Sequence, residues 1–137
     1  MTFALHPTLA KDCELIGDLP LCRVLLMNNS LFPWLVLVPR REGMRELYDL
    51  PEADYHAALA EVRRVAVQFN TLTSAHKMNI ACLGNMVEQL HIHVITRYQN
   101  DTAWPQPVWN ANVQAQRYSA EMLALLVEKF RVLTIPA

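Results

Sequence analysis

The alternation of polar and hydrophobic residues along 89–95 is the clearest structural pattern in the chain. Side chains two positions apart on a β-strand point to the same face of the sheet. One face therefore carries Gln89, His91 and His93, and the other carries Leu90, Ile92 and Val94. Burying imidazole and amide groups without hydrogen-bond partners is unfavourable. We therefore predict a strand whose hydrophobic face closes a core and whose polar face is open to solvent or to a ligand.

Four other segments have the composition of strands and are bounded by turn residues. They are residues 13–17, 21–27, 34–38 and 78–83. Glycine and proline occur in the link between the first two segments, which are expected to form a hairpin. A tight turn at Gly84 precedes the 89–95 strand, so backbone N–H groups are expected near its polar face.

The hydrophobic period changes to that of a helix over residues 51–70. Apolar residues recur there at steps of three or four positions: Tyr55, Leu59, Val62, Ala66 and Phe69. Pro51 in the first turn, followed by acidic residues, marks the start of this long helix. A short helix is predicted over 5–12, and a C-terminal helix with a serine N-cap over 119–132. Two closely spaced prolines exclude regular structure from 104–109.

This order of elements predicts an α+β fold with a five-stranded antiparallel sheet, one long helix and a C-terminal helix. We expect a single domain over residues 1–137, since no repeat, linker or low-complexity segment interrupts the chain. Hydrophobic residues make up 53% and charged residues 18%, with a formal net charge of −1. This balance is typical of a globular protein and gives no reason to expect bulk nucleic-acid or membrane binding.

The cysteine pattern and the absence of long apolar runs give an expectation for location. No apolar run approaches the ~20 residues that span a bilayer, and no signal peptide is apparent. The cysteines Cys13, Cys22 and Cys82 are odd in number, and their spacing matches no zinc or redox motif. We therefore expect reduced thiols in a cytoplasmic protein.

The two histidines of the polar face permit three interpretations. One is a solvated strand face without a chemical role, as is common in antiparallel sheets. Another is nucleophilic attack on phosphorus by one neutral imidazole, assisted by the second histidine on the same face. The third is metal binding, which needs further ligands, and the local candidates are Cys82, Cys22 and Glu88.

Residues 89–95 resemble the signature of the histidine triad (HIT) superfamily, in which three histidines alternate with hydrophobic residues. The resemblance continues in the third strand and its Pro-Arg-Arg exit at 35–41, and in residues 46–50 before the acidic helix start. Gly84-Asn85-Met86-Val87 is similar to the run that precedes the triad, and Arg97 matches an arginine that often follows it. The chain is identified as a divergent, bacterial-type member with glutamine at the first triad position.

The resemblance covers residues from about 20 to 100 and makes 101–137 a C-terminal extension with a helix. It implies a homodimer that binds nucleotides. It also implies hydrolysis or transfer of nucleotidyl groups from dinucleoside polyphosphates, such as diadenosine polyphosphates, or from nucleoside phosphoramidates, without a metal or cofactor.

The implied site residues follow from matching positions. His91 would attack the α-phosphate and carry the nucleotidyl group, and His93 would contact the phosphate. Asn85, beside Gly84, would bind a phosphate oxygen, and Asn79 is a weaker candidate for the same role.

Two departures from the family pattern leave other functions open. Gln89 replaces the first triad histidine, and Glu42 replaces a histidine that often follows the Pro-basic-basic exit. Glutamine donates and accepts hydrogen bonds but does not titrate near pH 7. The alternatives are a nucleotide-binding module with little or no catalysis, and a metal-binding domain or an interaction domain that uses Trp104 and Trp109.

Overall fold

The computed structural model describes residues 2–110 and 112–136, and it contains the predicted antiparallel sheet of five strands. The strand order is β1-β2-β3-β5-β4, and every neighbouring pair is antiparallel. The strands are β1 (Cys13–Asp18), β2 (Cys22–Met27), β3 (Trp34–Pro39), β4 (Lys77–Ala81) and β5 (Ile92–Arg97). The predicted α+β fold is therefore confirmed.

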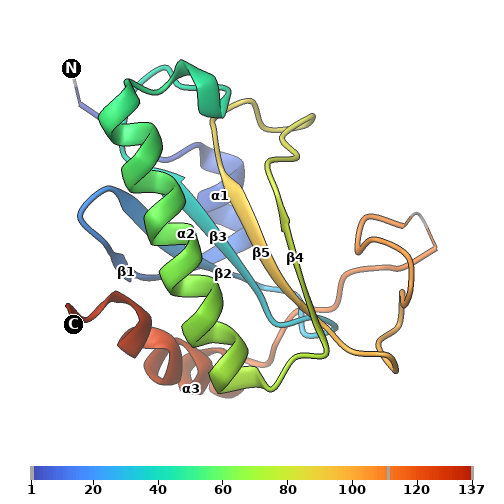
Figure 1. Ribbon diagram of the computed structural model, residues 1–137. Helices are drawn as coiled ribbons and strands as arrows, with labels where there is room; N and C mark the ends of the chain where they lie inside the picture. Colours follow the sequence, from blue (N-terminus) through green and yellow to red (C-terminus); the bar gives the residue numbers. More distant parts are fainter. Residues whose placement is uncertain (1, 111, 137) are drawn as a thin grey trace.

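Helices cover both faces of the sheet (Figure 1). They are α1 (Pro7–Asp12), α2 (Glu52–Thr73) and α3 (Ala120–Phe130), with short 3-10 turns at η1 (Leu47–Asp49) and η2 (Arg131–Thr134). The long helix α2 crosses the sheet on one side and α1 lies behind it on the other. Ser119 caps α3 by accepting a hydrogen bond from the backbone N–H of Met122, as the sequence predicts.

Each face of the sheet closes a separate hydrophobic core. Leu90, Ile92 and Val94 pack with α2 residues such as Val65 and Phe69. The opposite face packs Trp34, Val36 and Ile95 against Leu9 of α1. The alternation along 89–95 thus divides the side chains between the two faces as predicted.

The polar face is not open to solvent, which is the first of the two surroundings predicted for it. His91 is only 5% exposed and His93 only 4%. The regular strand β5 begins at Ile92 instead of position 89, because the residues before it form the loop that folds over the histidines. Burial is tolerated because three of the four ring nitrogens have hydrogen-bond partners among the described residues, which reduces the penalty for burying polar groups.

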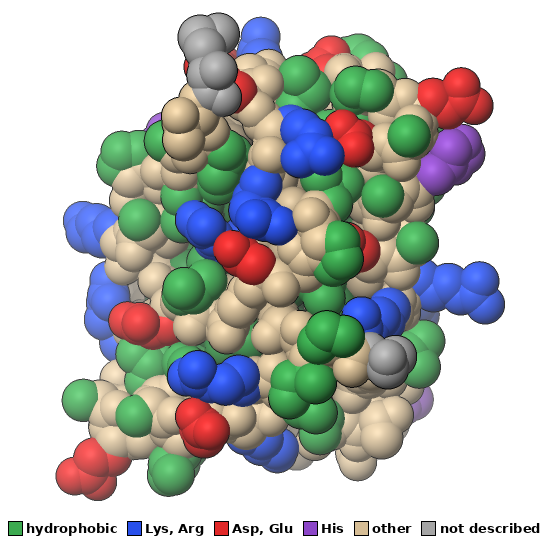
Figure 2. Space-filling model, turned by 90° about the vertical axis from the view of Figure 1, so that its left-hand side faces the viewer, with side chains coloured by type: hydrophobic (Ala, Val, Ile, Leu, Met, Phe, Trp, Pro, Cys, Tyr) green, Lys and Arg blue, Asp and Glu red, His purple; other side chains and the backbone are tan. Residues whose placement is uncertain are grey.

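Charged side chains of both signs are interspersed on the face shown in Figure 2. This distribution agrees with the net charge of −1 and gives no field that would attract a polyanion to this face. Among the described residues, no helix has the length and hydrophobicity needed to cross a membrane.

Candidate nucleotide-binding site around His91

His91 is held in one tautomer by the backbone. Its Nδ1 lies 2.6 Å from the carbonyl oxygen of Gln89, so Nδ1 carries the proton and donates it to this bond. Nε2 is then the nitrogen with the lone pair, and no described residue forms a hydrogen bond with it. Burial lowers the pKa of His91, which keeps the ring neutral at pH 7. A neutral imidazole with its lone pair on Nε2 has the protonation state that a nucleophile requires.

His93 differs from His91 although the two rings are adjacent, with centroids 4.8 Å apart. Its Nδ1 accepts a hydrogen bond from Trp34 Nε1 at 3.0 Å, and its Nε2 donates to the carbonyl oxygen of Leu83 at 2.9 Å. Both nitrogens are therefore engaged by the protein. His93 fixes the position of the loop that begins at Leu83, and Trp109 packs edge-on against its ring at 4.9 Å.

The glycine before the histidines allows the loop to approach them closely. A Cβ atom on Gly84 would lie 2.7 Å from the carbonyl oxygen of Val87 and 3.2 Å from Cε1 of His91. The first distance is shorter than a carbon–oxygen contact allows, so a larger residue would push the loop away from the ring. Gly84 is thus required by close packing at the site.

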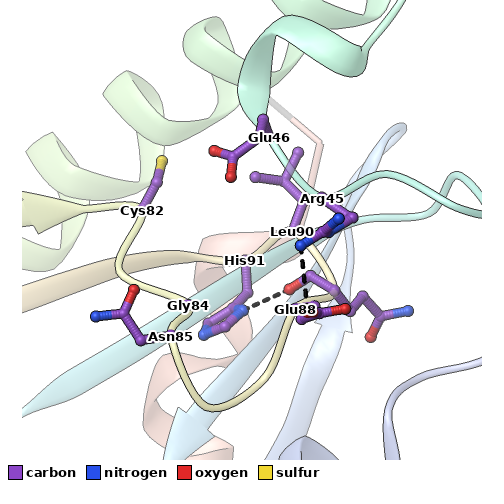
Figure 3. A pocket seen from close by; sticks show the side chains of 9 residues that line it. Arg45, Glu46, Cys82, Gly84, Asn85, Glu88, Leu90 and His91 are labelled. Atoms are coloured by element: carbon purple, nitrogen blue, oxygen red, sulfur yellow. Dashed lines mark hydrogen bonds and ion pairs between the residues drawn. The ribbon is translucent and has the colours of Figure 1, made fainter.

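Two hollows of different character meet at His91, Gly84 and Asn85. One, of about 190 Å³, is lined mainly by polar side chains, including Arg45, Glu46 and Glu88. The other, of about 210 Å³, is mainly apolar and is lined by residues that include Leu9, Met27, Trp34, Met86 and Trp109. Figure 3 shows the His91 ring beside the Gly84–Asn85 loop, with Cys82 on one side and Arg45 and Glu88 on the other.

The structure brings together most of the residues that the sequence singles out. Gly84, Asn85, Gln89 and His91 line the polar hollow, and His93 lines the apolar one. Asn79 is the exception, because its side-chain oxygen accepts a hydrogen bond from Arg97 at 2.9 Å. We therefore leave Asn79 out of the proposed phosphate site.

Several site residues escape prediction from the sequence. Trp34 reaches His93 from a strand 59 positions earlier, and its place at the start of a hydrophobic strand gives no hint of this contact. His6 and Arg45 line a wider hollow of about 620 Å³ beside Gln89 and Asn85. Of the two tryptophans singled out, Trp109 lies at the site, whereas Trp104 packs against Arg97 and His76.

The structure gives no support to the metal-binding alternative. Within residues 2–110 and 112–136, no three His, Cys, Asp or Glu side chains converge in a way that could hold a metal ion. Cys22 lies in the hydrophobic core shared with α2, on the side of the sheet opposite His91. Burial raises the pKa of Cys82, which makes its thiol a poorer ligand and nucleophile.

The buried neutral state of His93 predicts a loss of stability in mild acid. Burial lowers its pKa from 6.5 to about 4, so the unfolded chain binds a proton at a pH where the folded protein does not. The free energy of unfolding is therefore expected to be highest above pH 6.5 and to fall by about 3 kcal/mol as the pH drops towards 4.

Urea denaturation at several pH values tests this expectation against the variant His93→Gln, which cannot titrate in this range. The variant should lose much less stability than the wild type between neutral pH and pH 4. Equal losses in the two proteins would show that His93 is not the buried titrating group.

Comparison with known proteins identifies the family. The HIT domain model matches residues 8–100. A histidine triad protein from Marinobacter aquaeolei VT8 is 43% identical, with a TM-score of 0.94 over 98% of this chain and 97% of the other. One from Bradyrhizobium japonicum is 38% identical, with a TM-score of 0.93 over 98% and 100% of the two chains. A third, from Sinorhizobium meliloti 1021, is 37% identical, with a TM-score of 0.91 over 98% of each chain.

The fold and the site define a globular α+β protein with a buried histidine pair beside a glycine loop. The chain belongs to the histidine triad (HIT) family. No curated protein matches the sequence.

Proposed function

We propose that this protein hydrolyses or transfers nucleotidyl groups, with His91 as the nucleophile. The observation that carries the proposal is the bond from Nδ1 of His91 to the Gln89 carbonyl, which leaves the Nε2 lone pair for attack. Family membership supports a nucleotide as the ligand.

The reaction has two steps. Nε2 of His91 attacks the α-phosphorus, a phosphorus–nitrogen bond forms, and the bond to the leaving group breaks with its electron pair going to that group. The Gln89 carbonyl stabilises the positive charge that the imidazole gains, because its oxygen already accepts the Nδ1 proton. Water or another acceptor then attacks the nucleotidyl-histidine and regenerates the free ring.

The two hollows give the substrate an orientation. The apolar hollow, with Trp109 and Leu9 in its lining, suits a nucleoside, because an aromatic base packs well on apolar and aromatic side chains. The polar hollow on the other side of His91 suits the leaving group. The α-phosphate would then lie at the junction, beside Gly84 and Asn85.

Incubation of the purified protein with diadenosine polyphosphates and with adenosine phosphoramidate tests the proposal. Release of AMP and acid-labile labelling of the protein by the nucleotidyl group are expected. Absence of turnover on both substrate classes would contradict the enzymatic proposal.

A second candidate function is nucleotide binding with little or no catalysis. Gln89 cannot titrate, and both nitrogens of His93 are engaged, so neither is ready to protonate a leaving group. Calorimetry with AMP beside the activity assay separates the two candidates. Binding without turnover would favour the second.

We also propose a homodimer formed along the exposed edge of the sheet. Strand β4 is an edge strand, and its unpaired backbone groups can accept a second strand. Ile80 on this strand is 51% exposed, so an interface along β4 would cover an exposed apolar side chain. Sedimentation at micromolar concentration should give twice the monomer mass, and Ile80→Lys should shift the equilibrium towards monomer. A wild-type protein that sediments as a monomer would contradict the proposal.

The three cysteines are free thiols in the structure, and Cys13 and Cys22 are buried. This supports the proposal of a reducing, cytoplasmic compartment.

A further inference from the structure

Gln89, the residue at the altered triad position, holds the N-terminal segment against the site. Its Oε1 accepts a hydrogen bond from the backbone N–H of His6 at 2.8 Å. Its Nε2 donates to the backbone carbonyl oxygen of Ala4 at 2.9 Å. These two backbone groups flank Leu5, so the amide side chain bonds the segment much as a neighbouring strand would.

Only an amide of this length can form both bonds. Glutamine presents an acceptor and a donor side by side, whereas a neutral imidazole carries one of each on divergent ring positions. A histidine at position 89 would therefore release at least one of the two backbone groups. Glutamine in place of the family's first triad histidine therefore replaces a titratable side chain with one that holds the N-terminal segment.

The same residue also orients the nucleophile. The backbone oxygen of Gln89 accepts the Nδ1 proton of His91, while its side chain holds residues 4–6. Gln89 thus joins the N-terminal segment directly to the residue that would attack phosphorus.

Helix α1, which follows the clamped segment directly, forms part of the wall of the site. Thr8, Leu9 and Asp12 line the apolar hollow beside His91. His6 lines the wider hollow with Arg45, which brings two nitrogen-rich side chains to one cavity.

The ring of His6 has one nitrogen engaged and one available. Its Nδ1 accepts a hydrogen bond from the backbone N–H of Thr8 at 3.0 Å. The proton of the neutral ring is therefore on Nε2, for which the described residues provide no hydrogen-bond partner. Burial is the main cause of the lowered pKa of His91, and the proximity of His6 is a smaller one.

We propose that Gln89 is a positioning residue that clamps the N-terminal segment over the site, and that His6 thereby contacts a phosphate oxygen of the bound nucleotide. The ligand part rests on the proposed function. The clamp does not, so the two can fail separately.

Hydrogen exchange measured by NMR tests the clamp without any ligand. The amide of His6 should exchange at least tenfold faster in Gln89→Ala and in Gln89→His than in the wild type, because its acceptor is lost or misplaced. The amide of Leu26 in β2, which reports global stability, should be unchanged. Unchanged exchange at His6 in both variants would overturn the clamp.

Calorimetry with AMP tests the contact made by His6. The variant His6→Asn keeps a side-chain acceptor for the Thr8 N–H but removes the ring, and His6→Ser is a second variant that keeps the cap. Both should bind AMP with a Kd raised about tenfold, while the amide of residue 6 remains protected from exchange.

Two outcomes would overturn the ligand role of His6. One is wild-type affinity for AMP in both cap-preserving variants. The other is a wild-type protein that binds no AMP, which would also contradict the proposed function, although the exchange experiment would still decide the clamp.

Discussion

Replacing His91 with alanine is expected to lower kcat for nucleotide turnover by about a thousandfold or more, because the proposed covalent intermediate forms on its ring. The loss should fall mainly on kcat, since the apolar hollow that would hold the nucleoside is lined by many other residues. AMP release measured with a diadenosine polyphosphate or an adenosine phosphoramidate gives kcat, and calorimetry gives the Kd for AMP.

His56→Ala is the matched control. His56 lies on α2 with its side chain 69% exposed, so its removal deletes a histidine without disturbing the core. This variant should retain wild-type turnover. Unchanged turnover in His91→Ala would contradict the nucleophilic role of His91, and equal losses in the two variants would indicate an unspecific effect.

His91 and His93 belong to one sequence motif but differ in their hydrogen-bond partners. The two residues lie two positions apart and share one face, so the sequence assigns them similar roles. In the structure, no described residue bonds Nε2 of His91, whereas His93 has Trp34 on one nitrogen and the Leu83 carbonyl on the other. The division of roles depends on these partners and not on the spacing of the histidines.

The fold could be predicted from the sequence because its determinants are local. Alternation over 89–95 and the helical period over 51–70 each follow from neighbouring residues, and both give the correct elements. The ends of the elements are less well predicted. Helix α2 continues to Thr73 and ends only where Ser74 adopts a left-handed conformation, with φ of 51°.

The parts of the site that could not be predicted depend on contacts between distant positions. The bond between Gln89 and His6 spans 83 positions, and the bond between Trp34 and His93 spans 59. Neither residue type nor periodicity reveals such pairs. The polar face looks solvent-exposed in the sequence because its hydrogen-bond partners come from these distant segments and from backbone carbonyls.

Arg97 is a buried cation that ties the C-terminal extension to the sheet. Its side chain is 2% exposed and donates to both carboxylate oxygens of Asp101, at 2.8 and 3.0 Å. It also donates to Asn79 on the edge strand and to the backbone oxygen of Gln106. Burial is the largest single effect and raises the pKa of Asp101. The hydrogen bonds and charge of Arg97, together with the hydrogen bonds from the backbone N–H groups of Tyr98 and Ala103, outweigh it, so the pKa is lowered.

The substitution Arg97→Ala is expected to reduce the free energy of unfolding by about 3 to 5 kcal/mol, because it leaves the carboxylate of Asp101 buried without its cation. It also removes the anchor of the segment that carries Trp109, so the packing of this ring on His93 should loosen. Urea denaturation gives the free energy of unfolding, and tryptophan fluorescence reports the packing of Trp109 on His93. Arg63→Ala, on the exposed face of α2, is the control and should cost less than about 0.5 kcal/mol.

A double variant separates the lost ion pair from the lost packing. If the unpaired carboxylate causes most of the damage, Asp101→Asn should recover part of the stability lost in Arg97→Ala, because a neutral amide is less unfavourable in a buried position. If the damage comes from the vacated space and the lost contact with the Phe32 ring, 5.5 Å from the guanidinium carbon, the second substitution should bring no recovery. If Arg97→Ala were as stable as Arg63→Ala, a structural role for Arg97 would be contradicted. The match of Arg97 to the family pattern would then need a functional explanation.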